Sequence, residues 1–381
     1  MRYSVLIIFT FVFLSSCMST YNSTNVQTAG KAISSQYDSI RTVAENYSEK
    51  IEIKYAKGLK VDYREDGIHV SLSPALSQGE GDLVSELVIQ PGKHNRFICT
   101  TALQLGNFEV LGMEDKIVGI NSLKNIFSER ILAQIADGKT VKVGKEGVFD
   151  IENVIALKPD YIFVSASKYG GFEALKECGI PLVPHHGYKE ITPLGQAEWI
   201  KLIGLLTGET KRANAVFDYV EKEYLSLKEK VQQLKDNGVK MPTVLSGRQV
   251  RDGWYVMGGK SYMAQLFADA GARYIMSDVN ETGGTTLDFE TVYARGINAE
   301  YWQMDGSFDA DYTLDALAIE DARYADIKAY KEQKVLFCNF TLTPYRELAG
   351  VSPHLMLADF VKAFHPELLP AYKPKFYDFI K

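Results

Sequence analysis

Short apolar runs alternate with amphipathic stretches through the first half of the chain. The apolar runs, "RFICTT", "KIVGI", "DYIFVSA" and "IPLVPHH", have the length of buried strands. Residues 102–112 and 150–157, which lie between them, show helical patterns. This alternation predicts βαβ units around a parallel sheet.

The pattern changes between residues 192 and 237, where strand signals are absent. "PLGQAEWIKLIGLLTG" predicts a helix with an apolar face that ends at glycine. The next stretch, "ETKRANAVFDYVEKEYLSLKEKVQQLKDNG", begins with a threonine cap, mixes Glu and Lys four residues apart and ends in Asn-Gly. One helix of this length would span ~40 Å at about 1.5 Å per residue. We expect it to act as a strut between two lobes.

The alternation of strand and helix then resumes. "TVLSGRQ", "WYVMGG", "ARYI", "AEYWQM" and "KVLFCNF" predict strands, and "KSYMAQLFADAG", "LDFETVYARG", "DARYADIKAYKEQK" and residues 353–364 predict helices. One sequence motif also occurs twice. In "FDIENVIALKPDYIFV" and "LDFETVYARGINAEYW", Asp150 and Glu152 correspond to Asp288 and Glu290. The chain is therefore predicted to be two α/β lobes of similar design joined by a helix.

The N-terminal segment has a different character. Arg2 is the only charge in "MRYSVLIIFTFVFLSS", and the apolar run is too short for a membrane-spanning helix, so it predicts an export signal. The run ends in "LSSC", which resembles the lipobox of bacterial lipoproteins, in which the cysteine, here Cys17, is lipidated. Residues 51–91 hold two alternating runs separated by "REDG", which predict a small β-hairpin.

These patterns divide the chain into six segments. We expect a signal peptide at 1–16, a polar tether at 17–50, a small β extension at 51–91, an N-terminal α/β lobe at 92–205, a connecting helix at 206–238 and a C-terminal α/β lobe at 239–381.

Composition and motifs exclude several classes of function. The chain has 42 basic and 48 acidic side chains and no basic block, which argues against nucleic acid as a partner. Cys99, Cys178 and Cys338 lie in or beside apolar runs and form no C-x-x-C pair, so we expect buried free thiols, with a Cys99–Cys178 bridge as the alternative. The motifs G-x-x-x-x-G-K-[ST], G-x-S-x-G and H-E-x-x-H are absent. We therefore do not expect an enzyme.

Several motifs together resemble one family. "KVGKEGVFDIENVIALKPDYIFVSA", "EITPLGQAEWIKLIGLLTGE", "MGGKSYMAQLFADAGARY" and "HLMLADFVKAFHPELLP" are similar to class III solute-binding proteins of ABC importers, of the BtuF, FhuD and FecB type, and look like their iron-chelate branch. The resemblance covers residues 92–381; the 51–91 extension is seen only in part of the family. It implies two Rossmann-like lobes with small relative motion.

The resemblance also implies a function. Such a protein is a periplasmic, membrane-anchored lipoprotein without an intrinsic cofactor, which delivers an iron–siderophore to an ABC permease dimer. Haem or cobalamin is the alternative ligand. A bare-metal-binding protein or an exported α/β enzyme are further alternatives.

Candidate ligand-binding residues follow from the strand ends. Ligands of doubly wound sheets bind outside the carboxyl ends of the strands, which face each other in a two-lobed protein. Arginines there would pair with anionic groups, and aromatic side chains would stack. The predicted ligand-binding residues are Thr100, Thr101, Ser167, Tyr169, His186, Arg248, Arg251, Trp254, Phe308, Phe340 and Arg346.

Adjacent histidines at a strand end raise the question of a metal. His185 and His186 could supply an axial haem ligand, as could Tyr169. A bare-metal site would recruit several ligands from both lobes, and no facing histidine follows the other predicted strands. We therefore predict no protein-bound metal.

The repeated motif, which contains Glu152 and Glu290, has a predicted role of its own. In the resembled family, a glutamate on each lobe docks onto arginines of the permease, and the motif match carries this role to Glu152 and Glu290. A permease of two like subunits offers the same surface twice about a two-fold axis. The alternative is that each glutamate only favours the first turn of its helix, by ~0.3–1 kcal/mol.

Lipidation of Cys17 can be tested by fractionation. The Cys17→Ala protein should leave the membrane fraction and become soluble, because the lipid is its only expected anchor. If the substituted protein stays with the membrane, the lipobox interpretation fails.

Overall fold

The computed structural model describes residues 29–74, 85–89, 94–122, 124–145, 148–165 and 172–381. The predicted signal peptide, Cys17, Ser167 and Tyr169 lie outside these residues. Within them, no helix is both long enough and apolar enough to span a bilayer.

The N-terminal lobe is built on a parallel sheet, as expected. Its five strands run in the order β10-β9-β4-β5-β6, and every pairing is parallel. The strands are β4 (Phe97–Cys99), β5 (Ile117–Ile120), β6 (Val141–Lys142), β9 (Tyr161–Val164) and β10 (Leu182–Pro184). The helices are α3 (Ala102–Leu111), α4 (Glu129–Ala136), α5 (Ile151–Ala156) and α6 (Glu173–Glu177), and a small ribbon pairs β7 (Gly144–Lys145) with β8 (Val148–Phe149).

The C-terminal lobe repeats this design with additions. Its main sheet has the order β14-β11-β16-β17-β18, parallel except for the terminal strand β18. These strands are β11 (Thr243–Ser246), β14 (Arg273–Tyr274), β16 (Tyr301–Gly306), β17 (Val335–Asn339) and β18 (Asp378–Phe379). A second, antiparallel sheet holds β12 (Arg248–Val250), β13 (Gly253–Met257) and β15 (Gly284–Asp288). The helices are α10 (Tyr262–Asp269), α11 (Phe289–Gly296), α12 (Leu314–Glu320), α13 (Lys328–Lys331) and α14 (Pro353–Phe364).

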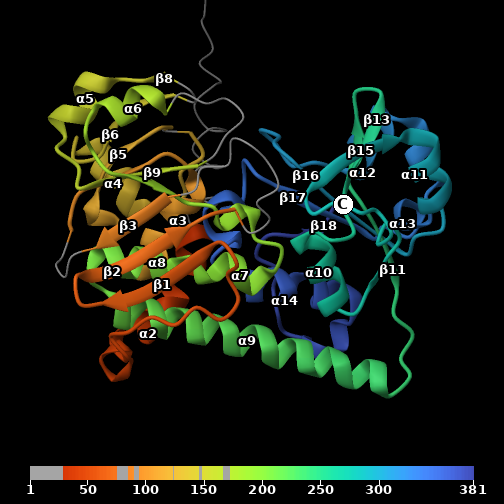
Figure 1. Cartoon of the computed structure of the whole chain (residues 1–381). Helices are drawn as coiled ribbons and strands as arrows, with labels where there is room; N and C mark the ends of the chain where they lie inside the picture. The colour runs from red at the N-terminus through yellow and green to blue at the C-terminus, as the bar shows by residue number, and fades with distance from the viewer. Residues whose placement is uncertain (1–28, 75–84, 90–93, 123, 146–147, 166–171) are drawn as a thin grey trace, which may run out of the picture.

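The expected strut is α9 (Thr210–Asp236), which runs beneath both lobes (Figure 1). It follows α7 (Pro193–Glu198) and α8 (Ile200–Thr207). Its buried residues, including Phe217, Val220, Tyr224, Leu227 and Val231, recur every three or four positions and form one apolar face. Burial of that face, more than helix propensity, stabilises so long an element.

A three-stranded antiparallel sheet follows, made of β1 (Leu59–Arg64), β2 (Gly67–Leu72) and β3 (Ser85–Ile89). Two buried carboxylates tie the preceding segment to the lobe linker. Glu198 accepts hydrogen bonds from backbone N–H groups of Lys54, Tyr55 and Ala56 and from Lys201 Nζ. Glu190 accepts from the N–H groups of Lys57 and Gly58 and from Trp199 Nε1. The extension is thereby part of the folded body.

Residues 29–46, in the C-terminal part of the expected polar tether at 17–50, are folded. Residues 29–34 are helical, and α2 (Asp38–Thr42) follows. Ile33 and Tyr37 are fully buried, and the Tyr37 hydroxyl lies 2.7 Å from Ser352 Oγ. Arg41 Nη1 donates to the Val110 carbonyl at the end of α3. A few apolar residues in a polar sequence suffice to dock this segment.

The lobes also meet at a second place, which we call the joint: the contact between α3 and the π-helical turn Tyr345–Ala349. A Cβ atom built on Gly106 would overlap the carbonyl oxygen of Glu347, so only glycine allows the backbones to come this close. Glu347 is fully buried, and its carboxyl group accepts the Phe127 N–H at 3.1 Å. The lobes are therefore held by the strut and by the joint.

Substituting Gly106 tests the joint. Gly106→Ala should destabilise the protein by about 3 kcal/mol or more, because backbone atoms cannot move aside as a side chain can. Chemical denaturation measures the loss. Gly283→Ala is the matched control, since a Cβ there meets nothing within 4 Å. Equal stability of the two variants would contradict the close approach.

Candidate functional site

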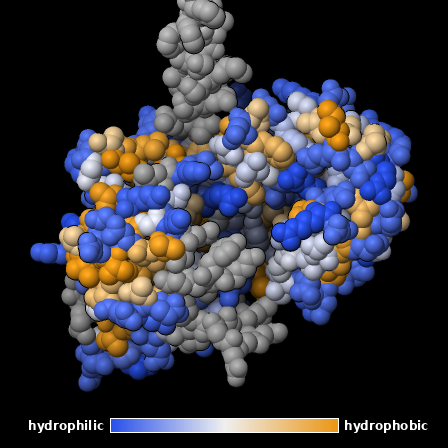
Figure 2. Space-filling model, turned by 90° about the horizontal axis from the view of Figure 1, so that it is seen from above, coloured by the Kyte–Doolittle hydropathy of each residue, from blue (hydrophilic) through white to orange (hydrophobic). Residues whose placement is uncertain are grey.

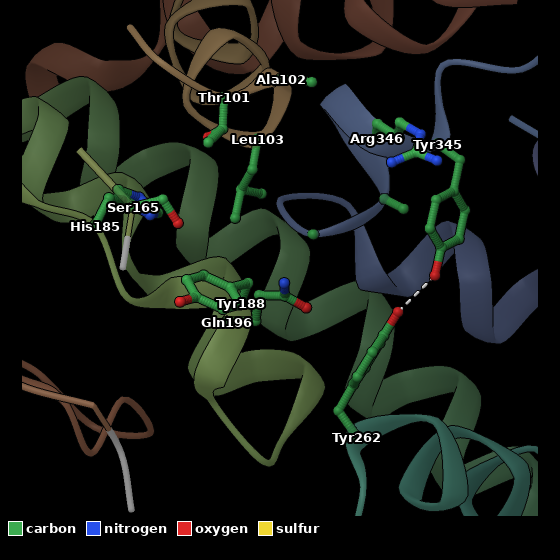
Figure 3. A pocket seen from close by; sticks show the side chains of 12 residues that line it. Thr101, Ala102, Leu103, Ser165, His185, Tyr188, Gln196, Tyr262, Tyr345 and Arg346 are labelled. Atoms are coloured by element: carbon green, nitrogen blue, oxygen red, sulfur yellow. Dashed lines mark hydrogen bonds between the residues drawn. The ribbon is translucent and has the colours of Figure 1, made fainter. Parts of the chain in front are cut away.

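A cavity of about 280 Å³ lies between the lobes (Figure 3). Seen from above, the molecule is hollowed between its two lobes (Figure 2). The cavity is lined by Thr101, Ala102, Leu103, Ser165, His185, Tyr188, Gln196, Tyr262, Tyr345, Arg346, Ala349 and Gly350. Thr101 and Arg346 were predicted from the strand ends, and they face the cavity from opposite lobes.

The N-terminal wall is made by the ends of three neighbouring strands. Thr101 follows β4, Ser165 follows β9 and His185 follows β10, and these strands are adjacent in the sheet. Gln104 Oε1 accepts the backbone N–H groups of Thr100 and Thr101, at 2.7 and 3.1 Å, which fixes the entry into α3. Parallel pairing thus places three polar side chains on one edge.

His185 is the chemically unusual residue of this wall. Its side chain is 1% exposed, and neither ring nitrogen has a hydrogen-bond partner. Burial lowers its pKa to about 3, so the ring is neutral at pH 7. Its ring packs against Trp199 at 5.0 Å between centroids. A neutral imidazole can accept a hydrogen bond or coordinate a metal centre.

The C-terminal wall is aromatic and cationic. Tyr262, in the first turn of α10, and Tyr345 share a hydrogen bond of 2.7 Å between their hydroxyl groups (Figure 3). Burial raises the pKa of Tyr262 to about 12. Arg346 is exposed, and its guanidinium lies 4.7 Å from the centre of the Phe340 ring. Stacking leaves the edge of the guanidinium able to bind an anion in bidentate fashion.

Two more predicted residues lie together at the strand ends of the C-terminal lobe. The Arg248 guanidinium lies 5.3 Å from the centre of the Phe308 ring and 3.1 Å from Glu320. Asn339 holds the backbone of Phe308 through both its amide atoms. Burial raises the pKa of the nearby Asp305 carboxyl group.

Three residues that were predicted to bind ligand do not line the cavity. Trp254 is fully buried, because β13 belongs to the antiparallel sheet and turns this side chain toward Phe289 and Trp302; its Nε1 donates to the Ser246 carbonyl. Arg251 is exposed in the turn between β12 and β13, with a φ of 56°. His186 is fully buried beside Trp199, so its neighbour His185 reaches the cavity instead.

Thr100 stays close to the site without lining the cavity. Its Oγ1 atom is buried and has no hydrogen-bond partner, and the same holds for Asn121 Oδ1 at the end of β5. Both are available to a ligand or to water at this edge.

The sequence did not single out Tyr188, Gln196, Tyr262 and Tyr345. Tyr262 follows the Gly-Gly-Lys-Ser turn that opens α10, and Tyr345 directly precedes Arg346. Aromatic residues at these positions were a usable signal. Tyr188 lies on the turn Gly187–Lys189 and Gln196 on α7, and the prediction from strand ends did not include either residue.

Glu152 and Glu290 occupy equivalent local positions. Asp150 accepts the Asn153 N–H and caps α5, and Asp288 accepts the Thr291 N–H and caps α11. Each glutamate is therefore the second residue of its helix, and each is exposed. They differ in one respect: Glu290 is paired with Arg323 at 2.8 Å, whereas Glu152 has no ion pair within the described part of the chain.

The arrangement suits binding of an anion. Among the described residues that line the cavity, Arg346 is the charged one and none carries a carboxylate. Over the described ranges, no three His, Cys, Asp or Glu side chains are placed to hold a metal ion. Cys99, Cys178 and Cys338 are free thiols, which leaves the alternative Cys99–Cys178 bridge unformed.

Comparison with known proteins fits this geometry. Residues 98–342 match the periplasmic binding protein family. Two uncharacterized lipoproteins of Methanocaldococcus jannaschii are similar in sequence. One is 26% identical over 297 residues, which are 74% of this chain and 68% of the relative. The other is 28% identical over 256 residues, which are 65% of this chain and 61% of the relative.

Solved structures share the fold. A periplasmic haem-binding protein from Pseudomonas aeruginosa has a TM-score of 0.58 and 19% identity, over 76% of this chain and 98% of that one. The periplasmic catecholate-siderophore binding protein VctP from Vibrio cholerae has a TM-score of 0.56 and 15% identity, over 79% and 99%. Since the family match spans more than half of the chain and the two-lobed α/β fold agrees, this chain belongs to the periplasmic binding proteins, in their class III architecture.

Proposed function

We propose that this protein is the substrate-binding lipoprotein of an ABC importer, and that it carries an anionic iron chelate of the siderophore type in the interlobe cavity. The observation that carries the proposal is the composition of the cavity: one wall has Arg346 and tyrosines, and the other has uncharged polar groups. The two lipoprotein relatives support an anchor at Cys17.

Charge favours a siderophore-type ligand. Arg248 follows β11 and Arg346 lies on the π-helical turn of the C-terminal lobe, and each has an aromatic ring beside its guanidinium. A guanidinium supported in this way pairs with catecholate or carboxylate oxygens. Among proteins of this fold, VctP is a catecholate-siderophore binding protein.

Haem or a corrinoid is the second candidate, and His185 is the observation that favours it. Its two ring nitrogens lack partners, and the ring is neutral at physiological pH. Such an imidazole could complete the coordination of a metal centre that arrives with an open position. The P. aeruginosa protein of the same fold is described as haem-binding.

Ligand titration separates these candidates. Ferric siderophores, haemin and cobalamin should be titrated while tryptophan fluorescence is recorded, because bound coloured chelates quench it. Saturable quenching by a ferric siderophore is expected, and His185→Ala should then have little effect. Tight haemin binding that His185→Ala abolishes would favour the second candidate, and no response to any of the three would contradict the proposal.

Arg346 should contribute most to binding an anionic chelate. Arg346→Ala should weaken binding at least ~10-fold and reduce its salt dependence, because a desolvated charge pair is lost. The control is Arg251→Ala, which removes an arginine from an exposed turn. If both variants bind like the unsubstituted protein, the anion-binding role of Arg346 is excluded.

We further propose that Glu152 and Glu290 dock the protein onto the permease. Both are exposed at the same position of equivalent helices, one on each lobe, so they offer a matching pair of acids to a permease with two-fold symmetry. Charged contacts of this kind set orientation and association rate.

The double variant Glu152→Ala plus Glu290→Ala should keep its chelate affinity and lose most uptake and receptor-stimulated ATP hydrolysis. Glu223→Ala plus Glu229→Ala removes the same charge from exposed positions on α9 and should leave uptake intact. Normal uptake by the first variant would show that the repeated motif serves only the folding of each lobe.

A further inference from the structure

The joint contains two buried acids that ligand binding does not use. Glu347 comes from the C-terminal lobe and is 0% exposed, and Glu109 comes from α3 of the N-terminal lobe and is 3% exposed. Gly106 and Glu109 are one helical turn apart on α3, and Gly106 is the residue against which Glu347 packs. The two residues therefore flank the same interlobe contact, and the charge on Glu109 adds to burial in raising the pKa of Glu347.

Within the described part of the chain, neither acid forms an ion pair. The Glu347 carboxyl group accepts the Phe127 N–H, and Glu109 Oε2 is buried with no partner. The Arg41 guanidinium lies near Glu109 but donates to the Asp38 carboxylate and to the carbonyls of Glu109 and Val110.

The other groups around Glu109 and Glu347 do not neutralise the charge that these acids would carry when ionised. Glu114 adds a further negative charge beside Glu109 and is itself paired with Arg130 at 3.0 Å. Ser34, from the helix at 29–34, is uncharged and contributes a side-chain hydrogen bond to the Glu109 carboxyl group. Ionising either acid would place an unpaired charge in a dry contact, which is costly.

We propose that Glu109 and Glu347 form a proton-dependent latch that holds the two lobes together at the joint. With both acids protonated, α3 and the turn Tyr345–Ala349 pack without net charge. When the acids lose their protons, repulsion and the demand for water separate the two elements. The latch is independent of which ligand the cavity takes.

The direction of the pH dependence follows from burial. Burial, reinforced by Glu114, raises the pKa of Glu109 from 4.5 to about 8, and burial raises that of Glu347 well above its usual value. Folded-state pKa values above those of the unfolded chain give a stability that is complete below pH ~4.3 and is lost as pH rises through about 8. The latch is closed at acid and neutral pH and opens on the alkaline side.

Opening the latch would reshape the cavity. The first turn of α3 supplies Thr101 to Leu103 to one wall, and the turn that carries Glu347 supplies Tyr345 and Arg346 to the other. Separation of these elements would move the anion-binding arginine away from the opposite wall. Proton binding at the joint and ligand binding in the cavity would then be coupled.

The test measures the distance between the lobes in the unliganded protein. Spin labels at Ile155→Cys and Ile319→Cys, both at exposed positions, report it in a Cys178→Ser background. The distance distribution should be narrow and constant from pH 6 to 7, and it should broaden between pH 7 and 9.5. In Glu109→Gln, it should remain narrow over the whole range.

Thermal unfolding gives a second readout. The melting temperature should fall by several degrees between pH 7 and 9.5, and this fall should be smaller in Glu109→Gln and in Glu347→Gln. Glu129→Gln is the matched control, because it removes an exposed acid of the same lobe that is paired with Lys31 at 3.0 Å, and the fall should persist in it.

Two results would overturn the latch. One is an interlobe distance that does not change with pH in the unsubstituted protein. The other is a Glu109→Gln variant that responds to pH as fully as the unsubstituted protein does. If Glu347→Gln fails to fold, Glu109→Gln still decides the question, since Glu109 Oε2 has no hydrogen-bond partner and the amide oxygen can keep the Ser34 contact.

Discussion

The close approach of α3 to the π-helical turn at residues 345–349 is the contact on which the rest of the molecule depends. Gly106 permits it, and the buried Glu347 carboxyl group seals it against the Phe127 N–H. The two elements that meet there also supply facing walls of the interlobe cavity. Packed interfaces of this kind have discrete arrangements and are not continuously deformable. The cavity therefore keeps its shape while α9 fixes the distance between the lobes.

The two lobes share a plan but present different chemistry to the cavity. The N-terminal lobe offers the neutral ends of three parallel strands, with an unpartnered imidazole at His185. The C-terminal lobe offers tyrosines and arginines stacked on Phe340 and Phe308. An elongated chelate would thus bind with its anionic side toward the C-terminal lobe. The lobes also differ outside the cavity. Glu290 forms an ion pair with Arg323, whereas Glu152 has no ion pair within the described ranges.

Buried carboxylates hold two irregular segments of this protein in place. Glu198 and Glu190 bind successive backbone N–H groups of residues 54–58, and Asp359 accepts the N–H groups of residues 375–377. In each case, one side chain fixes a chain segment that has no regular structure. Buried backbone donors must find acceptors, and a carboxylate can satisfy several at once. The N-terminal extension and the C-terminal tail are thereby joined to the lobes.

The sequence by itself indicated the main strands and helices of both lobes and their order. Helical spacing along 210–236, the capping Asp150 and Asp288, and the apolar strand runs are local signals, because each concerns residues within a few turns of one another. Tertiary structure decided which side chains meet. Trp254 is in the core because its strand pairs with β12 and β15 in a second sheet, and the run "TGGTT" gave no sign of that partner. Tyr262 and Tyr345 are 83 residues apart and share a hydrogen bond only because α10 and the π-helical turn fold together. Such contacts depend on chain segments far apart in sequence, and no local pattern records their distance.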